Sequence, residues 1–391
     1  MDERMTGMDA VVLGGGPAGL AAALALAQRG RRVAVYDAQR PPIDKACGEG
    51  LMPEAVRLLR ALGLALDERD GAPIAGISFH DAQASAYAAF DRGKGLGVRR
   101  TRLQARMAAR AAEMGIALHW GAAVQALPGG GFVSAGAAIR GDFFVIADGL
   151  CSTLAPASGF REHNCCSTRY ASRGQFHYRP RERTMADEVE VHWRSGEQLY
   201  VTPLGDGEAG VVLLTGIRGR RVCDALPDFP AVANRLAGAW RTLTMRGAVT
   251  RTRSLREVIR GNIAVLGDAA GSVDAVTGEG ILSALRQAHA LADALTAGEP
   301  QRYAAAHRQM AKGPQSMARL LLLLDRHPRL ERWFVARMAK RPKTFAALLR
   351  MHLGEQTWAG FVRSEAAAWM HVRDRSPSSL CAMKAQRERG L

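Results

Sequence analysis

Apolar and polar positions in the first forty residues predict a strand, a helix and a second strand. Asp9 to Leu13 is mainly a short apolar run, which is typical of a buried strand. Pro17 to Arg29 is rich in alanine and leucine and predicts a helix, and Arg32 to Asp37 predicts the second strand. Together these segments form a βαβ unit of about thirty residues, the beginning of a parallel sheet.

The same alternation returns further along the chain. Helices are predicted at Pro53 to Leu62, Leu103 to Met114 and Gly280 to Leu295, and buried strands at Ile116 to Trp120, Asp142 to Ala147 and Asn262 to Leu266. Between about Thr168 and Leu255 the pattern changes to short β-rich segments separated by turns, at Val189 to Trp193, Leu199 to Pro203 and Val211 to Thr215. These segments suit an antiparallel sheet beside the first domain. The chain beyond them is mostly helical, with breaks at Pro328 and Pro342.

A glycine-rich loop joins the first strand to the first helix. Gly14-Gly15-Gly16-Pro17-Ala18-Gly19 fits the pattern G-x-G-x-x-G. Gly14 permits the tight turn, Gly16 lets a pyrophosphate approach the backbone, and Gly19 lets the helix pack on the strand. The helix N-terminus offers free amide N–H groups to phosphates. Asp37, at the end of the second strand, can accept hydrogen bonds from a ribose hydroxyl. The loop therefore predicts a dinucleotide site.

A second copy of the pattern shows that the order of glycines alone is weak evidence for a dinucleotide site. Gly205-Asp206-Gly207-Glu208-Ala209-Gly210 also fits G-x-G-x-x-G. The residues after it, Val211 to Leu214, are strand-like rather than helical, so this copy is predicted to be a hairpin loop. Context therefore assigns the dinucleotide site to the first copy.

Three further motifs occur in order along the chain. They are Lys45-Ala46-Cys47-Gly48-Glu49-Gly50-Leu51-Met52-Pro53, then Asp148-Gly149, then Gly267-Asp268-Ala269-Ala270-Gly271 with Thr277-Gly278-Glu279-Gly280-Ile281 after it. With the glycine loop, they resemble the FAD-dependent monooxygenases and geranylgeranyl reductase-like flavoproteins, which share the para-hydroxybenzoate hydroxylase-type fold. The resemblance implies FAD as the cofactor.

The resemblance also implies roles for particular residues. It places Asp268 on the ribityl chain, the helix N-terminus at Gly278 to Ile281 against the flavin ring, and Asp148 close to the cofactor. Arg100 matches a position at which an arginine contacts the cofactor. The expected FAD-binding residues are Gly14, Gly16, Pro17, Ala18, Gly19, Asp37, Cys47, Gly48, Arg100, Asp148, Gly267, Asp268, Gly278, Glu279, Gly280 and Ile281. No catalytic residue is assigned. Cys47 is the candidate near the ring, either as a redox or covalent group or as a small residue tolerated beside it.

These motifs divide the chain into discontinuous domains. We expect an α/β fold in which a Rossmann-like FAD-binding domain carries an inserted antiparallel β-sheet substrate domain and a helical C-terminal region. The FAD-binding domain comprises residues 1–72, 98–165 and 256–300. The substrate domain comprises residues 73–97 and 166–255, and the C-terminal region comprises residues 301–391.

Composition and charge limit the other classes of function. The chain of 391 residues has 53 basic and 37 acidic residues, a net charge of +16. No aromatic-basic nucleic-acid motif accompanies this surplus, so no nucleic-acid partner is expected. Six scattered cysteines without a C-x-x-C pair argue against a structural metal. The N-terminus lacks the pattern of a secretory signal and no apolar run would span a membrane, so a cytoplasmic location is expected.

The chemistry remains open between alternatives. The first expectation is a monooxygenase that hydroxylates or epoxidises a hydrophobic aromatic, polyketide or isoprenoid substrate through a flavin hydroperoxide, with NAD(P)H as a transient electron donor. The second is a double-bond reductase of the geranylgeranyl reductase type. The Cys47-Gly48-Glu49-Gly50 and Gly278-Glu279-Gly280-Ile281 spellings favour it, whereas Leu199 to Pro203 only partly echoes its aromatic substrate motif. The third is an electron-transfer flavoprotein dehydrogenase.

Basic and apolar residues alternate near the C-terminus. Arg326 to Arg350 contains eight basic residues and one acidic residue, interleaved with leucines and aromatic residues. Either this segment is an ordinary helical cap with a solvated basic side, or it meets anionic lipid or a long acyl or isoprenoid substrate. Peripheral membrane contact through these helices is therefore one expectation.

Overall fold

A six-stranded sheet forms the base of the fold in the computed structural model, which describes residues 7–178, 186–194, 196–242, 244–357 and 359–363. Its order is β19-β20-β12-β1-β2-β8. The strands are β1 (Ala10–Leu13), β2 (Val33–Asp37), β8 (Ala117–Trp120), β12 (Phe143–Ile146), β19 (Ile259–Arg260) and β20 (Ile263–Val265). β1 is buried throughout and runs parallel to both neighbours, with Val12 opposite Val35 and Val145. A continuous apolar run is what a strand covered on both faces requires.

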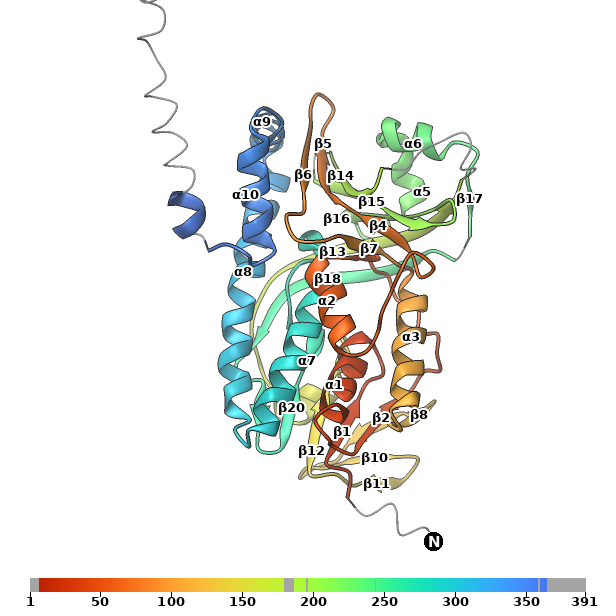
Figure 1. Cartoon of the computed structure of the whole chain (residues 1–391), viewed down its shortest axis with the longest axis vertical. Helices are drawn as coiled ribbons and strands as arrows, with labels where there is room; N and C mark the ends of the chain where they lie inside the picture. The colour runs from red at the N-terminus through yellow and green to blue at the C-terminus, as the bar shows by residue number, and fades with distance from the viewer. Residues whose placement is uncertain (1–6, 179–185, 195, 243, 358, 364–391) are drawn as a thin grey trace, which may run out of the picture.

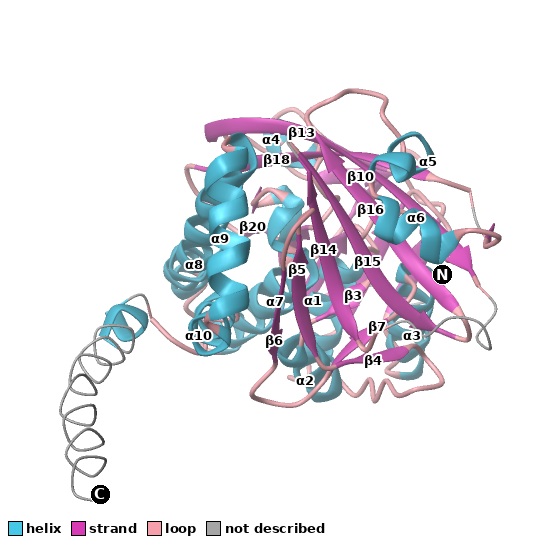
Figure 2. Ribbon diagram, turned by 90° about the horizontal axis from the view of Figure 1, so that it is seen from above, coloured by secondary structure: helices cyan, strands magenta, loops and turns pink. Residues whose placement is uncertain are grey.

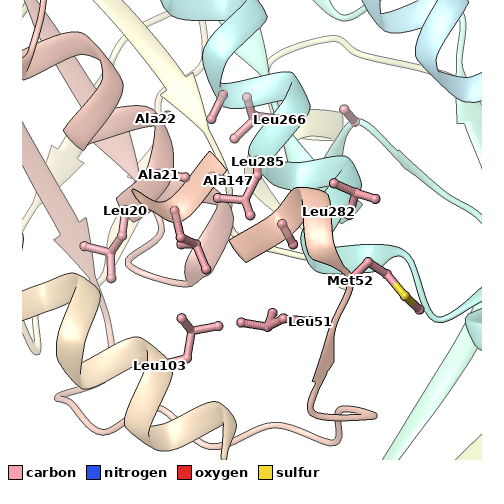
Figure 3. Packing of buried hydrophobic residues seen from close by; sticks show 14 of the residues in the cluster. Leu20, Ala21, Ala22, Leu51, Met52, Leu103, Ala147, Leu266, Leu282 and Leu285 are labelled. Atoms are coloured by element: carbon pink, nitrogen blue, oxygen red, sulfur yellow. The ribbon is translucent and has the colours of Figure 1, made fainter. Parts of the chain in front are cut away.

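Helices cover this sheet and form the main core with it. They are α1 (Pro17–Ala27), α2 (Pro53–Ala61), α3 (Arg100–Glu113) and α7 (Gly280–Thr296). Four alanines of α1, at positions 21, 22, 23 and 25, are fully buried, because small side chains let the helix pack closely against α7. Figure 3 shows Leu20 and Ala22 of α1 near Leu282 and Leu285 of α7, with Leu103 of α3 on the other side.

A nine-stranded sheet lies over the first sheet (Figures 1 and 2). Its strands are β5 (Gly76–His80), β6 (Ser85–Ala89), β13 (Glu162–His177), β14 (Glu188–Arg194), β15 (Glu197–Gly205), β16 (Glu208–Thr215), β17 (Trp240–Arg241), β18 (Arg246–Leu255) and β21 (Gly271–Ser272). All its pairs are antiparallel except β14 with β5, which is parallel. Side chains alternate between its faces. Leu199 and Val201 pack under helices α5 and α6, whereas Tyr200 and Thr202 face the FAD-binding part of the chain.

Smaller elements complete the described chain. Two three-stranded sheets contain β3 (Gly50–Leu51), β7 (Gly95–Gly97) and β4 (Ala72–Ile74), and β9 (Val124–Ala126), β10 (Phe132–Ser134) and β11 (Ala137–Ile139). Short helices are α4 (Leu154–Ala157), α5 (Val222–Ala225) and α6 (Pro230–Leu236), and single 3₁₀ turns occur at Leu226–Asp228, Gly267–Ala269 and Ala275–Thr277.

The fold class and the elements read from apolar periodicity are confirmed. The look-alike glycine pattern is the hairpin between β15 and β16, as predicted. Two long strands, β13 and β18, escaped prediction because their polar and charged residues hide the alternation. Arg100 is the first residue of α3 rather than a residue before the helix. The proposed domain limits remain a prediction, and β13 runs across the limit at 165/166.

Three C-terminal helices stand along one side of the molecule (Figure 1). They are α8 (Gln301–Arg326), α9 (Pro328–Lys340) and α10 (Pro342–His352). Pro328 and Pro342 each open a helix, which is the position where a missing backbone N–H costs least. No helix in the described ranges is long and apolar enough to cross a membrane. The predicted C-terminal region continues to residue 391, but residues 364–391 lie outside the described part.

A buried glutamate in α9 makes the stability of the protein depend on pH. Glu331 is only 5% exposed, and burial together with Asp81 raises its pKa to about 7. Ionisation in the folded state is therefore unfavourable, so stability falls as pH rises from about 4.5 through about 7. We expect Glu331→Gln to raise the free energy of unfolding above pH 7 by roughly 1 kcal/mol, with the gain vanishing towards pH 4.5. Urea unfolding across this range measures it, and Glu113→Gln, on an exposed end of α3, is the control.

Candidate functional site

A cavity of about 1870 Å³ lies where the carboxyl ends of the parallel strands meet the nine-stranded sheet. Loops after β1, β12 and β20 open into it, which is the expected ligand position in an open parallel sheet. It is lined by most of the residues that the sequence singled out. These are Gly16, Pro17, Ala18, Cys47, Gly48, Arg100, Asp148, Gly267, Asp268, Gly278, Glu279, Gly280 and Ile281. Gly14, Gly19 and Asp37 lie behind this lining.

Gly14 and Gly19 shape the loop by close packing. Gly14 has φ of +122°, and a methyl group there would lie 2.3 Å from the carbonyl oxygen of Ala147. A methyl group on Gly19 would meet the carbonyl oxygen of Gly14. Strand, loop and helix are thus in backbone contact, and no side chain fits between them.

Asp37 also forms hydrogen bonds within the protein. Its carboxylate accepts the N–H of Gly15 at 2.7 Å and the N–H of Gln39 at 2.7 Å. These bonds hold the glycine loop against the end of β2. Since a carboxylate has further lone pairs, Asp37 could still accept a ribose hydroxyl.

Positive charge gathers above the glycine loop. Gly16 is open towards the cavity, and the nearest atom to a methyl group placed there is Arg100 Nη2 at 4.0 Å. Lys45 Nζ would lie 3.4 Å from a methyl group on Gly149. Burial raises the pKa of the nearby Asp268 carboxyl, while Arg100, Arg253 and Lys45 oppose this shift. Arg100 beside the N-terminus of α1, with Lys45 beside Gly149 in the same cavity, suits a pyrophosphate group.

Only one of the two carboxylate oxygens of Asp148 has a hydrogen-bond partner in the described chain. Its Oδ2 accepts the backbone N–H groups of Thr153 at 3.1 Å and Leu154 at 3.3 Å. Its Oδ1 is buried without a hydrogen-bond partner in the described chain. An unpartnered buried oxygen at the edge of this cavity is an acceptor available to a ligand.

The Cys47 to Gly50 segment is tied to the nine-stranded sheet. Thr202 Oγ1 donates to the carbonyl of Gly48 at 2.8 Å, and Gln175 Nε2 donates to the Glu49 carboxylate at 2.6 and 2.8 Å. Burial raises the pKa of Glu49. Burial also raises the pKa of the Cys47 thiol, outweighing the pull of Arg100, so this side chain is a neutral thiol near pH 7. A methyl group on Gly48 would meet nothing within 4 Å, so the space beside this residue is open.

A carboxylic acid and a histidine meet at the N-terminus of α7. Glu279 is 2% exposed, and neither of its carboxyl oxygens has a hydrogen-bond partner in the described residues. Its Oε2 lies 3.8 Å from Nδ1 of His352 in α10, whose Nε2 lies 3.0 Å from the carbonyl oxygen of Thr277. Burial raises the pKa of Glu279, although His352 and Arg286 oppose the shift. The pair can hold a proton in a dry site.

A second, apolar cavity of about 90 Å³ adjoins the first. The two share Gly48, Gly50, Tyr200, Thr277 and Gly278. The apolar cavity is walled by Met52, Ile77, Phe79, Val189, Val191, Trp193, Val276, Met317, Leu321, Phe345, Leu348 and Leu349, with Thr202 and His352 as further polar side chains. The buried indole N–H of Trp193 has no described partner. The Tyr200 hydroxyl donates to the carbonyl of Val276 at 2.8 Å, between the two cavities.

Another polar cluster lies away from both cavities. His80, Glu190 and His192 have ligand atoms within 4.8 Å of one another. The Glu190 carboxylate is already engaged by Arg235 and by His192 Nε2 at 2.8 Å, so this cluster is an internal ion-pair network. The pKa of His80 is lowered to about 4, mainly by burial.

The large cavity fits FAD on the observations above. It offers a helix N-terminus and cations for phosphates, an unpartnered buried oxygen at Asp148, and open glycine surfaces at Gly16, Gly48 and Gly280. The FAD binding domain family model matches residues 7–173. Menaquinone reductase of Mycolicibacterium smegmatis is 30% identical over 360 residues, covering 82% of this chain and 85% of that protein.

The chain belongs to this family of FAD-dependent oxidoreductases.

Other relatives agree with this flavoprotein assignment. Menaquinone reductase of Mycobacterium tuberculosis is 55% identical over 56 residues, or 14% of each chain. A flavin-dependent brominase has a similar structure, with a TM-score of 0.77 and 18% identity over 95% of this chain and all of that one. A geranylgeranyl bacteriochlorophyll reductase-like protein from Thermoplasma acidophilum has a TM-score of 0.72 and 16% identity over 91% and 98%. p-Nitrophenol 4-monooxygenase from Pseudomonas putida has a TM-score of 0.75 and 17% identity over 89% and 97%. These structures show the fold that the flavoprotein shares.

Sequence reasoning missed several residues of this flavoprotein's site. Lys45 and Glu49 lie inside the motif from Lys45 to Pro53, but the sequence pattern assigns no role to their side chains. His352 and Trp193 come from α10 and β14, far from any motif. A buried histidine near the end of an apolar helix has no spacing that reveals its partner, so only the fold brings His352 to Glu279.

Proposed function

We propose that this protein is an FAD-dependent reductase that saturates a carbon–carbon double bond of a hydrophobic, isoprenoid-quinone-type substrate. The observation that carries the proposal is the buried Glu279–His352 pair, which lies where the cofactor cavity meets an apolar cavity. Reduction of a double bond adds a hydride to one carbon and a proton to the other, so it needs a proton donor in a dry pocket. The relative that matches most of this chain, and the one that is 55% identical over 56 residues, are both named menaquinone reductase.

Under this proposal, FAD binds in the large cavity, with its ADP half at the glycine loop. Arg100 and Lys45 face the pyrophosphate together with the N-terminus of α1. Asp268 would accept a hydrogen bond from the ribityl chain, and Asp148 Oδ1 from a neighbouring hydroxyl. Gly48 and Gly280, where a methyl group would meet nothing within 4 Å, would leave room for the ring. When bound and reduced, FAD supplies the hydride chemistry.

The chain's own residues then prepare the substrate and its proton. The walls of the apolar cavity hold an aliphatic or isoprenoid group and exclude water. The unpartnered indole N–H of Trp193 offers a hydrogen bond to a carbonyl oxygen, such as that of a quinone. Burial raises the pKa of Glu279, which favours the protonated acid that donates the proton. His352, whose Nδ1 lies 3.8 Å from the carboxyl, is the group through which a proton taken up from water returns to Glu279.

Hydroxylation or epoxidation is the second candidate. The apolar cavity supports it too, because an oxygenase needs a dry pocket more than a protein acid. In that reaction the Glu279–His352 pair has no necessary step, which is why reduction ranks first. NAD(P)H is the proposed electron donor in either case.

Turnover with NADPH or NADH, with and without oxygen, tests the proposal. Using menaquinone as the probe, we expect oxygen-independent formation of a product that has gained two hydrogens, followed by mass spectrometry and by the flavin spectrum. Substrate-stimulated oxygen uptake with a product that gains an oxygen atom would support the second candidate instead. Absence of reduction for both menaquinone and a simple isoprenoid alkene would remove the proposed substrate class.

A further inference from the structure

Helix α9 has one buried side and one solvent-facing side of unusual composition. Its exposed stripe follows helical spacing: Arg329, Arg332, Trp333 and Lys340 lie within an arc of about 100°. Trp333 is 60% exposed. The preceding end of α8 adds Leu323, which is 46% exposed, and Arg326. We call these six side chains the α9 face.

The charged groups of the α9 face lack close ion-pair partners in the described chain. None of its four cations forms an ion pair with a described residue, although Arg332 Nε donates to the carbonyl of Pro328 at 3.2 Å. The two nearby acids point elsewhere. Asp325 lies 3.3 Å from Arg169 and accepts from Gln198, and Glu331 is buried on the opposite side of α9. The face is therefore purely cationic around two apolar side chains.

The same helix touches the wall of the apolar cavity from its other side. Phe334 packs against Phe79, with ring centroids 6.4 Å apart, and Phe79 lines the cavity. Phe345 of α10 lies 5.0 Å from Phe79 and lines the cavity as well. Figure 2 shows α9 on the outer side of the molecule, away from α5 and α6. The α9 face and the apolar cavity are thus separated by one helix layer.

The geometry points to an anionic lipid bilayer as the partner of the α9 face. Cations attract acidic headgroups, and Trp333 and Leu323 enter the interface beneath them. An acidic protein would use the cations but gain little from two isolated apolar side chains. Docking through the α9 face sets the helical wall of the apolar cavity against the membrane. A lipid-like substrate resides in that membrane. The docking does not require the proposed reduction, so each can fail without the other.

Vesicle sedimentation of the full-length, FAD-loaded protein tests this inference. We expect binding to vesicles of phosphatidylcholine mixed with phosphatidylglycerol, little binding to phosphatidylcholine alone, and weaker binding as salt rises. The pair Arg329→Gln and Arg332→Gln should weaken binding about 25-fold, at about fivefold for each cation. Trp333→Ala should weaken it several-fold.

Matched substitutions elsewhere separate the face from the overall positive charge. Arg60→Gln with Arg140→Gln removes two exposed cations that have no ion-pair partner among the described residues, and Trp240→Ala removes an indole that is 52% exposed. These controls should bind vesicles almost as the parent protein does. Circular dichroism and flavin content check that each variant is folded. Equal losses in the control and α9 variants, equal binding to neutral vesicles, or no binding at all would overturn the inference.

Discussion

Replacing Gly14 with alanine is expected to leave the protein almost without bound FAD. Gly14 has φ of +122°, and the added methyl group would lie 2.3 Å from the carbonyl oxygen of Ala147. The three nearest atoms all belong to the backbone of Ala147 and Asp148, so no side-chain rotation can relieve the clash and the glycine loop must move away from the segment after β12. We expect a loss of roughly 3 kcal/mol or more, equivalent to at least a hundredfold weaker FAD binding. Flavin absorbance per protein and titration of the apoprotein with FAD measure this loss.

Gly30→Ala is the matched control for this substitution. Gly30 also has positive φ, of 78°, and follows the other end of α1, but a methyl group there meets nothing within 4 Å. It should cost about 1 kcal/mol of stability and leave FAD affinity unchanged. Normal flavin content in the Gly14 variant would show that the glycine loop does not hold the cofactor.

Replacing Glu279 with glutamine is expected to slow substrate reduction about 100-fold while FAD stays bound. Glutamine keeps the size and polarity of the side chain but cannot deliver a proton. The parent enzyme requires Glu279 in its protonated form, so its activity should be present below the raised pKa of this residue and decline as pH rises through it. Arg286 and His352 face the carboxyl and lower its pKa, and Glu54 raises it. The variant should lose this alkaline limb of the kcat profile.

Two further variants test whether the pH dependence of turnover arises from the Glu279–His352 pair. His352→Asn should displace the alkaline limb, since it removes the partner 3.8 Å from the carboxyl. Glu331→Gln alters another buried acid of raised pKa that lines neither cavity, so it should leave turnover unchanged. Reduction of the flavin by NAD(P)H should be equal in all of them. A Glu279→Gln enzyme with normal kcat and an unchanged pH profile would rule out Glu279 as the donor.

Local patterns in the sequence were enough for much of the FAD-binding part. The β1 strand, the glycine loop and α1 are contiguous, so their apolar run, glycines and alanines can be read together. The other motifs carry small residues for a shared reason, because the backbone must approach a flat ligand. Periodicity failed for β13, whose Arg169, Arg173 and Gln175 point into buried polar contacts and break the alternation of apolar positions.

The sequence by itself determined that a dinucleotide loop exists, that its look-alike at Gly205 is a hairpin, and that Pro328 and Pro342 divide the terminal helices. Each of these depends on neighbours within a few residues. Only the tertiary structure decided that Asp37 braces Gly15, that Glu279 meets His352, and that Trp193 closes an apolar cavity. Those contacts join segments that are far apart in the sequence. Burial in the shared interior then shifts the pKa of some side chains and leaves polar atoms of others without hydrogen-bond partners. No local sequence pattern predicts these effects.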